Sequence, residues 1–129
     1  MRHKILVADD DFDNRTIIRD ALEAASYEVV MAANGEEALE KIASERPELV
    51  LLDLSMPRVN GWEVAKRVRE DAALEDMPII AFTAHALAGE ELKAKEAGCD
   101  DYMSKPCRPQ EVLERIAHWI RQKADPKPA

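Results

Sequence analysis

The chain has little cysteine and glycine and no long apolar run, and each of these shortages excludes a class of protein. Its two cysteines, Cys99 and Cys107, fit neither a metal-ligand spacing nor a disulfide framework, so we expect reduced thiols in a cytoplasmic protein. The four glycines do not cluster, which argues against the glycine-rich phosphate loop of flavin- or nucleotide-binding domains. No apolar run approaches the ~18 residues of a membrane span, and no signal peptide precedes the first predicted strand.

Basic residues are scarce relative to acidic ones, and this bounds the choice of partner. The chain of 129 residues has 18 Lys and Arg against 26 Asp and Glu, a net charge of −8. A domain this acidic gains nothing from the electrostatics of a phosphate backbone, so we do not expect direct binding to nucleic acid. The apolar share of 47% is enough for one domain with its own core.

The length predicts one domain, residues 1–123, followed by a flexible tail at 124–129 with the sequence Ala-Asp-Pro-Lys-Pro-Ala. Met1 stands directly before the first predicted strand, and the tail is too short for an output module. We therefore expect a free-standing protein that signals to a separate partner, as a monomer or a weak dimer.

Strand-like and helix-like segments alternate along the chain, as apolar runs and apolar residues at helical spacing. Asn34 and Asn60 each precede a Glu by three residues, which is typical of a helix start, and Gly98 predicts a helix end. Five such units predict an α/β protein, a doubly wound parallel sheet with helices on both faces. Strands are expected at 4–8, 27–31, 49–53, 78–82 and 101–103, and helices at 12–25, after Asn34, after Asn60, at 86–96 and from Pro109.

The same spacing predicts which helical side chains face the sheet. Trp62 and Trp119 are expected at the rim of the core, and the 86–96 helix has only a thin apolar stripe. The expected inward residues are Ile17, Ile18, Ala21, Leu22 and Ala25, then Ala38, Leu39, Ile42 and Ala43, then Val64, Ala65 and Val68, and finally Val112, Leu113, Ile116, Ala117 and Ile120.

Residues with chemically useful side chains follow four of the five predicted strands. Asp9 and Asp10 follow the first strand, Asp53 ends the third, Thr83 follows the fourth and Lys105 comes just after the fifth. Because the carboxyl ends of strands in an open α/β sheet share one edge, these residues are predicted to converge. Several carboxylates placed together repel one another unless a cation lies between them.

The residue types at this edge suit phosphoryl transfer to a carboxylate. Asp53 is the predicted nucleophile, which would form an acyl phosphate. Asp10 and Asp53 are hard oxygen ligands for Mg²⁺, which would screen the acids and the transferring phosphoryl group. Lys105 supplies a second positive charge, and Thr83 a hydroxyl donor to a phosphoryl oxygen.

Each of these residues alone carries little information. An Asp after a strand is about as often a turn residue as a catalyst, and Asp11 and Asp13 are expected to complement the dipole of the following helix. The signal lies in the combination at four strand ends.

In this combination the chain resembles the receiver domain of two-component response regulators over essentially its whole length. The resemblance implies a flavodoxin-like fold with strand order 2-1-3-4-5. It also implies that Asp53 is phosphorylated by a histidine kinase or a histidine phosphotransfer protein, so that the protein is a phosphoacceptor that assists its own phosphorylation and dephosphorylation rather than an enzyme. The matching segments are Ile5 to Asp10, Leu51-Leu52-Asp53 with Met56-Pro57 and Gly61, Phe82-Thr83-Ala84, and Tyr102 to Pro106.

The resemblance further implies the roles of individual residues around the phosphorylation site. Mg²⁺ would be held by Asp10, Asp53 and the backbone carbonyl of Ser55, with Asp9 acting through water.

A switch is implied as well. Thr83 and Tyr102 would form the switch pair, Ala84 would leave the phosphate room, and Lys105-Pro106 would be a cis peptide. The face made by the 86–96 helix, the 101–103 strand and the last helix would bind a downstream effector.

Some positions depart from the usual family pattern, and other interpretations stay open. Arg108 stands where a helix-capping Ser, Thr or Asp is expected, and Ser55 and His85 are variable positions that bear on the lifetime of the phosphorylated state. The chain also fits a receiver cut from a hybrid histidine kinase. An aspartyl-phosphate phosphatase of the haloacid dehalogenase type would need a second Asp at position 55.

Overall fold

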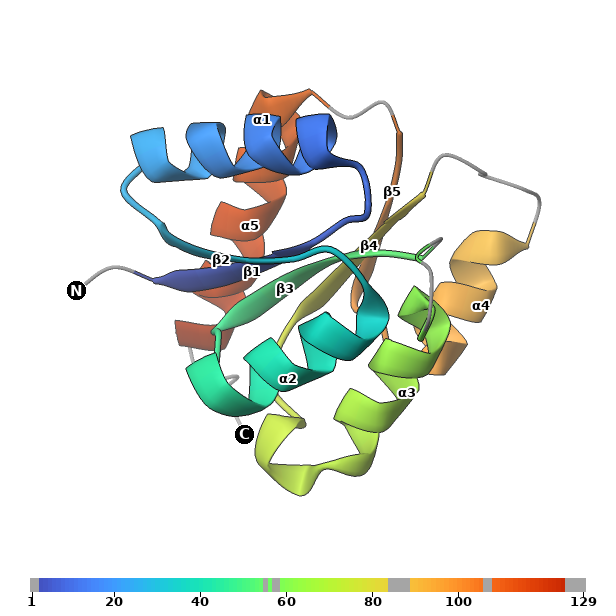
Figure 1. The fold of residues 1–129 in the computed structure, drawn as a ribbon. Helices are drawn as coiled ribbons and strands as arrows, with labels where there is room; N and C mark the ends of the chain where they lie inside the picture. The colour runs from blue at the N-terminus through green and yellow to red at the C-terminus, as the bar shows by residue number, and fades with distance from the viewer. Residues whose placement is uncertain (1–2, 55, 57–58, 84–88, 106–107, 125–129) are drawn as a thin grey trace.

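The computed structural model describes residues 3–54, 56, 59–83, 89–105 and 108–124. Five parallel strands form one sheet in the order β2-β1-β3-β4-β5, and α1 and α5 cover one face while α2, α3 and α4 cover the other (Figure 1). This confirms the predicted doubly wound, flavodoxin-like fold. The strands are β1 (Lys4–Ala8), β2 (Glu28–Ala32), β3 (Leu49–Asp53), β4 (Ile79–Thr83) and β5 (Asp101–Ser104), and the helices are α1 (Phe12–Ala24), α2 (Gly35–Glu45), α3 (Gly61–Glu70), the 3₁₀ turn η1 (Ala72–Leu74), α4 (Glu90–Ala97) and α5 (Pro109–Ala124).

Helices on both faces explain why the strands are continuous apolar runs. Every residue of β3 and β4 is buried. Successive side chains of one strand point to opposite faces, so Leu6 and Ala8 join the core beneath α2, α3 and α4, while Ile5 and Val7 join the core beneath α1 and α5. The sheet is thus fixed on both sides, and its carboxyl edge is a rigid place for polar groups.

The helix ends follow the sequence signals. The side chain of Asn34 accepts a hydrogen bond from the Glu37 N–H at 2.8 Å, and that of Asn60 accepts one from the Glu63 N–H at 3.0 Å. Gly98 ends α4 with φ at 112°, a conformation that favours glycine. These caps satisfy amide groups that have no partner within the helix.

Several predicted boundaries differ from the observed ones by a residue or a few. β2 lies one residue later than predicted, β5 extends to Ser104, and the proline predicted to start β4 precedes it. The predicted helix at 86–96 is observed as α4, and residues 86–88 lie outside the described part of the chain. The turn η1 was not predicted; the Asp71 side chain caps it by accepting from the Ala73 N–H at 2.9 Å.

Three predicted inward residues are wrong. Ile17 is 54% exposed while its neighbour Ile18 is buried. Ala43 is likewise exposed beside the buried Ile42, and Ala25 is exposed just after the end of α1. Consecutive residues on a helix are about 100° apart, so a pair of neighbours at the edge of the stripe divides between core and solvent.

The helix α4 is short and contributes little to the core. It buries only Ala94 and Ala97, and Leu92 is 62% exposed, which confirms the thin apolar stripe. Trp62 and Trp119 are half-buried, one against each core, as predicted. Among the described residues, no helix is both long and apolar enough to span a membrane.

Candidate functional site

The carboxyl end of β1 places one acid inside the fold and one outside it. The Asp9 N–H continues the strand ladder by donating to the Ala32 carbonyl at 3.0 Å, and the Asp9 side chain is fully buried. Asp10 is exposed. Asp11 turns the chain into α1, and its carboxylate caps that helix by accepting from the Asn14 N–H at 3.0 Å. The expected role of Asp11 at the helix end is confirmed.

The carboxyl end of β3 brings Asp53 to the same edge. Asp53 is 2% exposed and pairs in register with Phe82 of β4. The first residue of α3 packs against this strand end, because a Cβ at Gly61 would come within 2.4 Å of the Asp53 carbonyl oxygen. A larger residue at position 61 would push α3 away and disturb the setting of Asp53.

Lys105 reaches this edge from β5. Its N–H donates to the Thr83 carbonyl at 2.8 Å, and its Nζ lies 3.1 Å from Asp53 Oδ2 and 3.2 Å from Asp9 Oδ2. The Nζ also lies 4.9 Å from the centre of the Phe82 ring. Burial lowers the pKa of Lys105, but the charges of Asp53 and Asp9 and their hydrogen bonds outweigh burial, so the pKa is raised and the ammonium stays charged.

Three carboxylates converge beside this one ammonium. One oxygen from each of Asp9, Asp10 and Asp53 lies within 4.8 Å of the others. Carboxylate oxygens are the ligands that Mg²⁺ prefers, and the site combines two buried acids with one exposed acid. The donor set therefore fits the predicted metal.

Thr83 and Tyr102 lie on neighbouring strands. Thr83 ends β4 and is fully buried, and Tyr102 of β5 is paired with Ala81. The Tyr102 hydroxyl is enclosed and has no hydrogen-bond partner among the described residues. Burial, followed by the charges of Glu90 and Glu91 in the first turn of α4, raises the pKa of Tyr102. The hydroxyl is therefore neutral and close to α4.

Some predicted positions cannot be placed. Ser55, Ala84, His85, Pro106 and Cys107 lie outside the described residues, so the carbonyl ligand at Ser55 and the cis peptide Lys105-Pro106 stay predictions. The cap position at Arg108 is described, and its carbonyl accepts from the N–H groups of Glu111 and Val112 in the first turn of α5.

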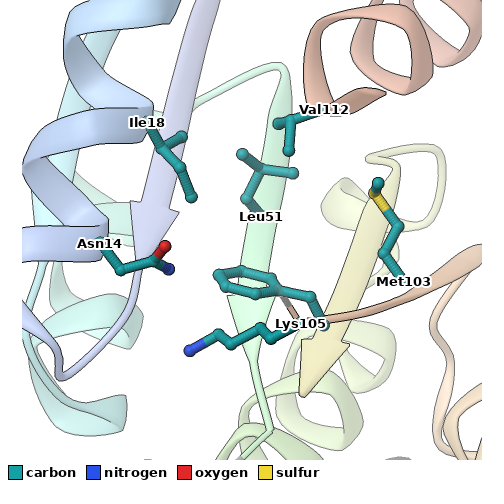
Figure 2. A pocket seen from close by; sticks show the side chains of 7 residues that line it. Asn14, Ile18, Leu51, Met103, Lys105 and Val112 are labelled. Carbon is teal, nitrogen blue, oxygen red and sulfur yellow. The ribbon is translucent and has the colours of Figure 1, made fainter. Parts of the chain in front are cut away.

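Two residues that the sequence did not single out contact Asp9. The Asn14 side-chain amide donates to Asp9 Oδ2, and Arg15 Nη1 donates to the Asp9 carbonyl at 2.7 Å. Figure 2 shows Asn14 of α1 and Lys105, the residue after β5, extending toward the same space. The available signal was a polar residue in the first helical turn after an acidic strand end, where side chains point back toward the strand.

A larger hollow of about 450 Å³ lies at the opposite edge of the sheet. Residues that precede β3 and β4, including Pro47 and Met77, line it together with the end of α2. Ligands of open α/β sheets bind at the carboxyl ends of strands, so the acidic edge is the better candidate for a functional site than this hollow.

Comparison with known proteins agrees with the geometry. The model of the response regulator receiver domain family matches residues 5–117. The polar-differentiation response regulator DivK of Brucella anthropi is 36% identical over 120 residues, which cover 93% of this chain and 98% of DivK.

Two solved structures are similar over most of their length. A CheY-like response regulator receiver domain protein from Methanospirillum hungatei has a TM-score of 0.90 at 30% identity, with 96% of this chain and 98% of that chain covered. The chemotaxis response regulator CheY4 of Vibrio cholerae has a TM-score of 0.87 at 29% identity, with coverage of 92% and 99%. The acidic edge with its shared lysine, the strand order and these matches together show that the chain belongs to the response regulator receiver domain family.

Proposed function

We propose that this receiver domain is the phosphoacceptor of a two-component or phosphorelay system and that Asp53 is the residue phosphorylated. The observation that carries the proposal is the setting of Asp53: a buried carboxylate at a strand end, 3.1 Å from the Lys105 ammonium and close to two further acids. A lone structural ion pair would not need the additional acids, which raise the local negative charge.

In the proposed reaction, an Asp53 carboxylate oxygen attacks the phosphorus of a phosphohistidine on a histidine kinase or phosphotransfer protein. A P–O bond to Asp53 forms, the P–N bond breaks, and the imidazole leaves with its electron pair and takes a proton from solvent. Lys105 stays an ammonium and balances the charge that the phosphoryl group brings. Thr83, at the end of the neighbouring strand, would donate its hydroxyl to a phosphoryl oxygen.

Mg²⁺ is part of this proposal. Asp10 and Asp53 would hold the ion, with Asp9 acting through water. When bound, it neutralises charge on the transferring phosphoryl oxygens. The protein itself carries the product, so it is a signalling protein rather than an enzyme that turns over a separate substrate. No observation among the described residues favours the phosphatase alternative.

The signal is proposed to leave through the face of α4, β5 and α5. Movement of the Thr83 hydroxyl toward the phosphoryl group would change the space beside Tyr102, whose hydroxyl is enclosed near α4. The thin apolar contact of α4 supports a helix that shifts at low free-energy cost. An effector that binds one state better then reads the change.

We infer that the domain acts as a free-standing regulator. The support comes from DivK, a response regulator by name, which is matched over 98% of its own length and is therefore about as long as one receiver domain. A receiver cut from a hybrid kinase is the alternative, and the size of the natural protein, detected with an antibody against this domain, distinguishes the two.

The phosphoacceptor is tested by labelling with acetyl phosphate. Wild type should take up one phosphoryl group only when Mg²⁺ is present, and Asp53→Asn should take up none while it keeps the fold. Asp76→Asn makes the same chemical change at an exposed position and should label like wild type. Stoichiometric labelling of Asp53→Asn would refute the assignment.

The switch is tested by NMR with beryllofluoride, a phosphoryl mimic. In wild type, backbone shift changes should extend from the acidic edge to Tyr102 and the α4–β5–α5 face. In Thr83→Ala they should stay at the acidic edge. Changes confined to that edge in wild type as well would leave a phosphate carrier without a switch.

A further inference from the structure

Asn14 touches the acidic edge from a direction that none of the predicted site residues covers. It lies in the first turn of α1, where its backbone N–H is already used by the Asp11 cap. Its side-chain Nδ2 donates to Asp9 Oδ2. In Figure 2 the amide of Asn14 and the ammonium of Lys105 point toward the same space from two different elements. Asn14 is thus a direct contact of the acid cluster.

The Asp9 carboxylate determines which atom of the Asn14 amide faces it. An ionised carboxylate only accepts hydrogen bonds, so the side-chain nitrogen of Asn14 must face Asp9. The opposite orientation would place two oxygen atoms against each other. Asn14 therefore gives Asp9 a donor that carries no charge.

This donor matters because the cation beside Asp9, Lys105, is shared with Asp53. Asp9 Oδ1 accepts from the Asp11 N–H at 2.9 Å and lies 3.4 Å from Lys105 Nζ. Asp9 Oδ2 lies 3.2 Å from the same Nζ and accepts from Asn14. The Asp11 N–H and the Asn14 amide are two neutral donors to Asp9, so this carboxylate does not need Lys105 as its only partner. The ammonium can then remain 3.1 Å from Asp53.

The space beside Asn14 is too small for a ligand of its own. The cavity lined by Asn14, Lys105 and the apolar residues around them has a volume of about 10 Å³. This is at the lower limit for a single water molecule. The side chain of Asn14 therefore acts on its protein neighbours.

We propose that Asn14 is a positioning residue of the phosphoacceptor site. By donating to Asp9 Oδ2 it fixes the plane of that carboxylate and keeps Lys105 on Asp53. This inference rests on the proposed function for the reaction it assists, while its effect on the geometry of Asp9 also determines how the acid cluster binds a divalent cation.

The test compares two readouts in Asn14→Leu, a variant of similar size without a donor. One is the rate of labelling by acetyl phosphate, and the other is the dissociation constant for Mg²⁺, followed by the fluorescence of the half-buried Trp62 beside Gly61. Both should worsen by about tenfold, the lower end of the range for residues that orient metal ligands. If Asn14→Leu folds poorly, Asn14→Ser takes its place. Its shorter side chain ends before Asp9, so it should show the same losses.

Asn14→Asp replaces the donor by a fourth carboxylate and should lose more than Asn14→Leu. Its control is Thr16→Asp, which adds the same charge about 200° around the helix and should behave like wild type.

A double-mutant cycle distinguishes positioning from a general structural effect. If Asn14 acts through Asp9, then Asn14→Leu should change neither readout further in an Asp9→Asn background. Wild-type values in Asn14→Leu, or the same tenfold losses in the Asp9→Asn background, would overturn the proposal. If wild type takes no label at all, the proposed function fails, and the Mg²⁺ titration alone then decides the role of Asn14.

Discussion

Lys105 and Arg69 each contact a carboxylate, at opposite edges of the same sheet. At the carboxyl edge, Lys105 Nζ is 3.1 Å from Asp53 Oδ2 and 3.2 Å from Asp9 Oδ2. At the amino edge, Arg69 Nη2 donates to Asp100 Oδ2 at 2.6 Å. A guanidinium presents several donors in a fixed fork, whereas an ammonium is a point charge on a flexible stem. The Lys105 ammonium is shared between two acids, whereas the Arg69 guanidinium pairs with one.

Arg69 joins four parts of the fold. Its Nε donates to the Gly98 carbonyl at 2.7 Å, and its Nη1 donates to the carbonyls of Leu74 and Glu75 at 3.1 Å each. A Cβ at Gly98 would lie 2.4 Å from Arg69 Cγ, so glycine is needed there for space as well as for its φ. Arg69 thereby ties the end of α3 to η1, to the end of α4 and to the start of β5.

At the carboxyl edge, the charges of the described residues do not cancel. Three acids face Lys105 and the guanidinium of Arg15, which donates to the Asp9 carbonyl, so three negative charges against two positive charges leave a net charge of −1. At the amino edge, Arg69 and Asp100 form a neutral pair. The comparison indicates that a balanced, multiply bonded cluster serves stability, while an unbalanced one suits the cation and the phosphoryl group that we propose for the carboxyl edge.

The largest effect on stability is expected at the amino edge. Arg69→Ala should lower the free energy of unfolding by about 3 kcal/mol, because it removes four contacts and leaves Asp100 and three carbonyls with fewer donors. Urea denaturation measures the loss, and the stabilisation by Mg²⁺ should equal that of wild type.

Arg67→Ala is the matched control for this prediction. Arg67 is exposed on the same helix and pairs with Glu63 four residues away, so its loss should change stability by no more than about 0.5 kcal/mol. Equal effects of the two substitutions, or an altered Mg²⁺ response in Arg69→Ala, would break the distinction between the two edges.

Lys105→Met should show the next largest effect, and this effect, unlike that of Arg69→Ala, should depend on Mg²⁺. In this variant without Mg²⁺, Asp9 and Asp53 lack their shared cation, and we expect a destabilisation of about 2 kcal/mol. This is below the ~3–5 kcal/mol for a fully buried pair, because the Lys105 side chain is 19% exposed. Added Mg²⁺ should shrink the difference from wild type. Lys66→Met, at an exposed site on α3, should have little effect in either condition. A loss independent of Mg²⁺ would make Lys105 a structural residue like Arg69.

Asp10→Asn should have a smaller effect of opposite sign. Removing one of three neighbouring carboxylates relieves repulsion, so the protein without Mg²⁺ should gain about 1 kcal/mol. The variant should gain less from added Mg²⁺ than wild type does, because binding to the folded state is the source of that stabilisation. Thermal unfolding with and without the ion measures both, and Asp76→Asn controls for the change in net charge. An equal Mg²⁺ response in wild type and Asp10→Asn would show that Asp10 is no ligand.

The sequence predicted the carboxyl edge well because strand ends carry its residues. Apolar runs marked β1, β3 and β4, and parallel strands of one sheet share their carboxyl edge, so the convergence of Asp9, Asp53 and Lys105 followed from topology alone. Their roles in phosphorylation stay predictions. Asn14 escaped notice because its contact depends on the rotation of α1, which no sequence period fixes to within one residue.

The amino edge could not be predicted in the same way. The Arg69 contacts reach 5 to 31 residues along the chain and mostly use backbone carbonyls, which every residue has. The sequence indicated Gly98 as a helix end but gave no sign of the arginine packed against it. Ile17 shows the same limit within one helix, since periodicity alone could not choose between it and Ile18.

The smallest predicted effect appears at alkaline pH, where only one of the two cations titrates. Burial lowers the pKa of Lys105, but Asp53 and Asp9 raise it more, so the folded-state value lies above the ~10.4 of an unfolded chain. Stability from such a group is present below the unfolded pKa and is lost as the pH rises through the folded pKa. The stability difference between wild type and Lys105→Met should therefore stay constant up to about pH 9.5 and shrink above about pH 10.5.

The difference between wild type and Arg69→Ala should stay constant across the same range, because a guanidinium keeps its proton beyond about pH 12. Comparing each variant with wild type at the same pH cancels the titration of the other residues, including Cys99, whose pKa burial raises to about 12. Parallel behaviour of the two differences would mean that the Lys105 charge does not stabilise the acidic edge. If only the stability of Lys105→Met approaches that of wild type at high pH, the carboxyl edge is stabilised by a titratable charge. The amino edge is then stabilised by hydrogen bonds that persist over this pH range.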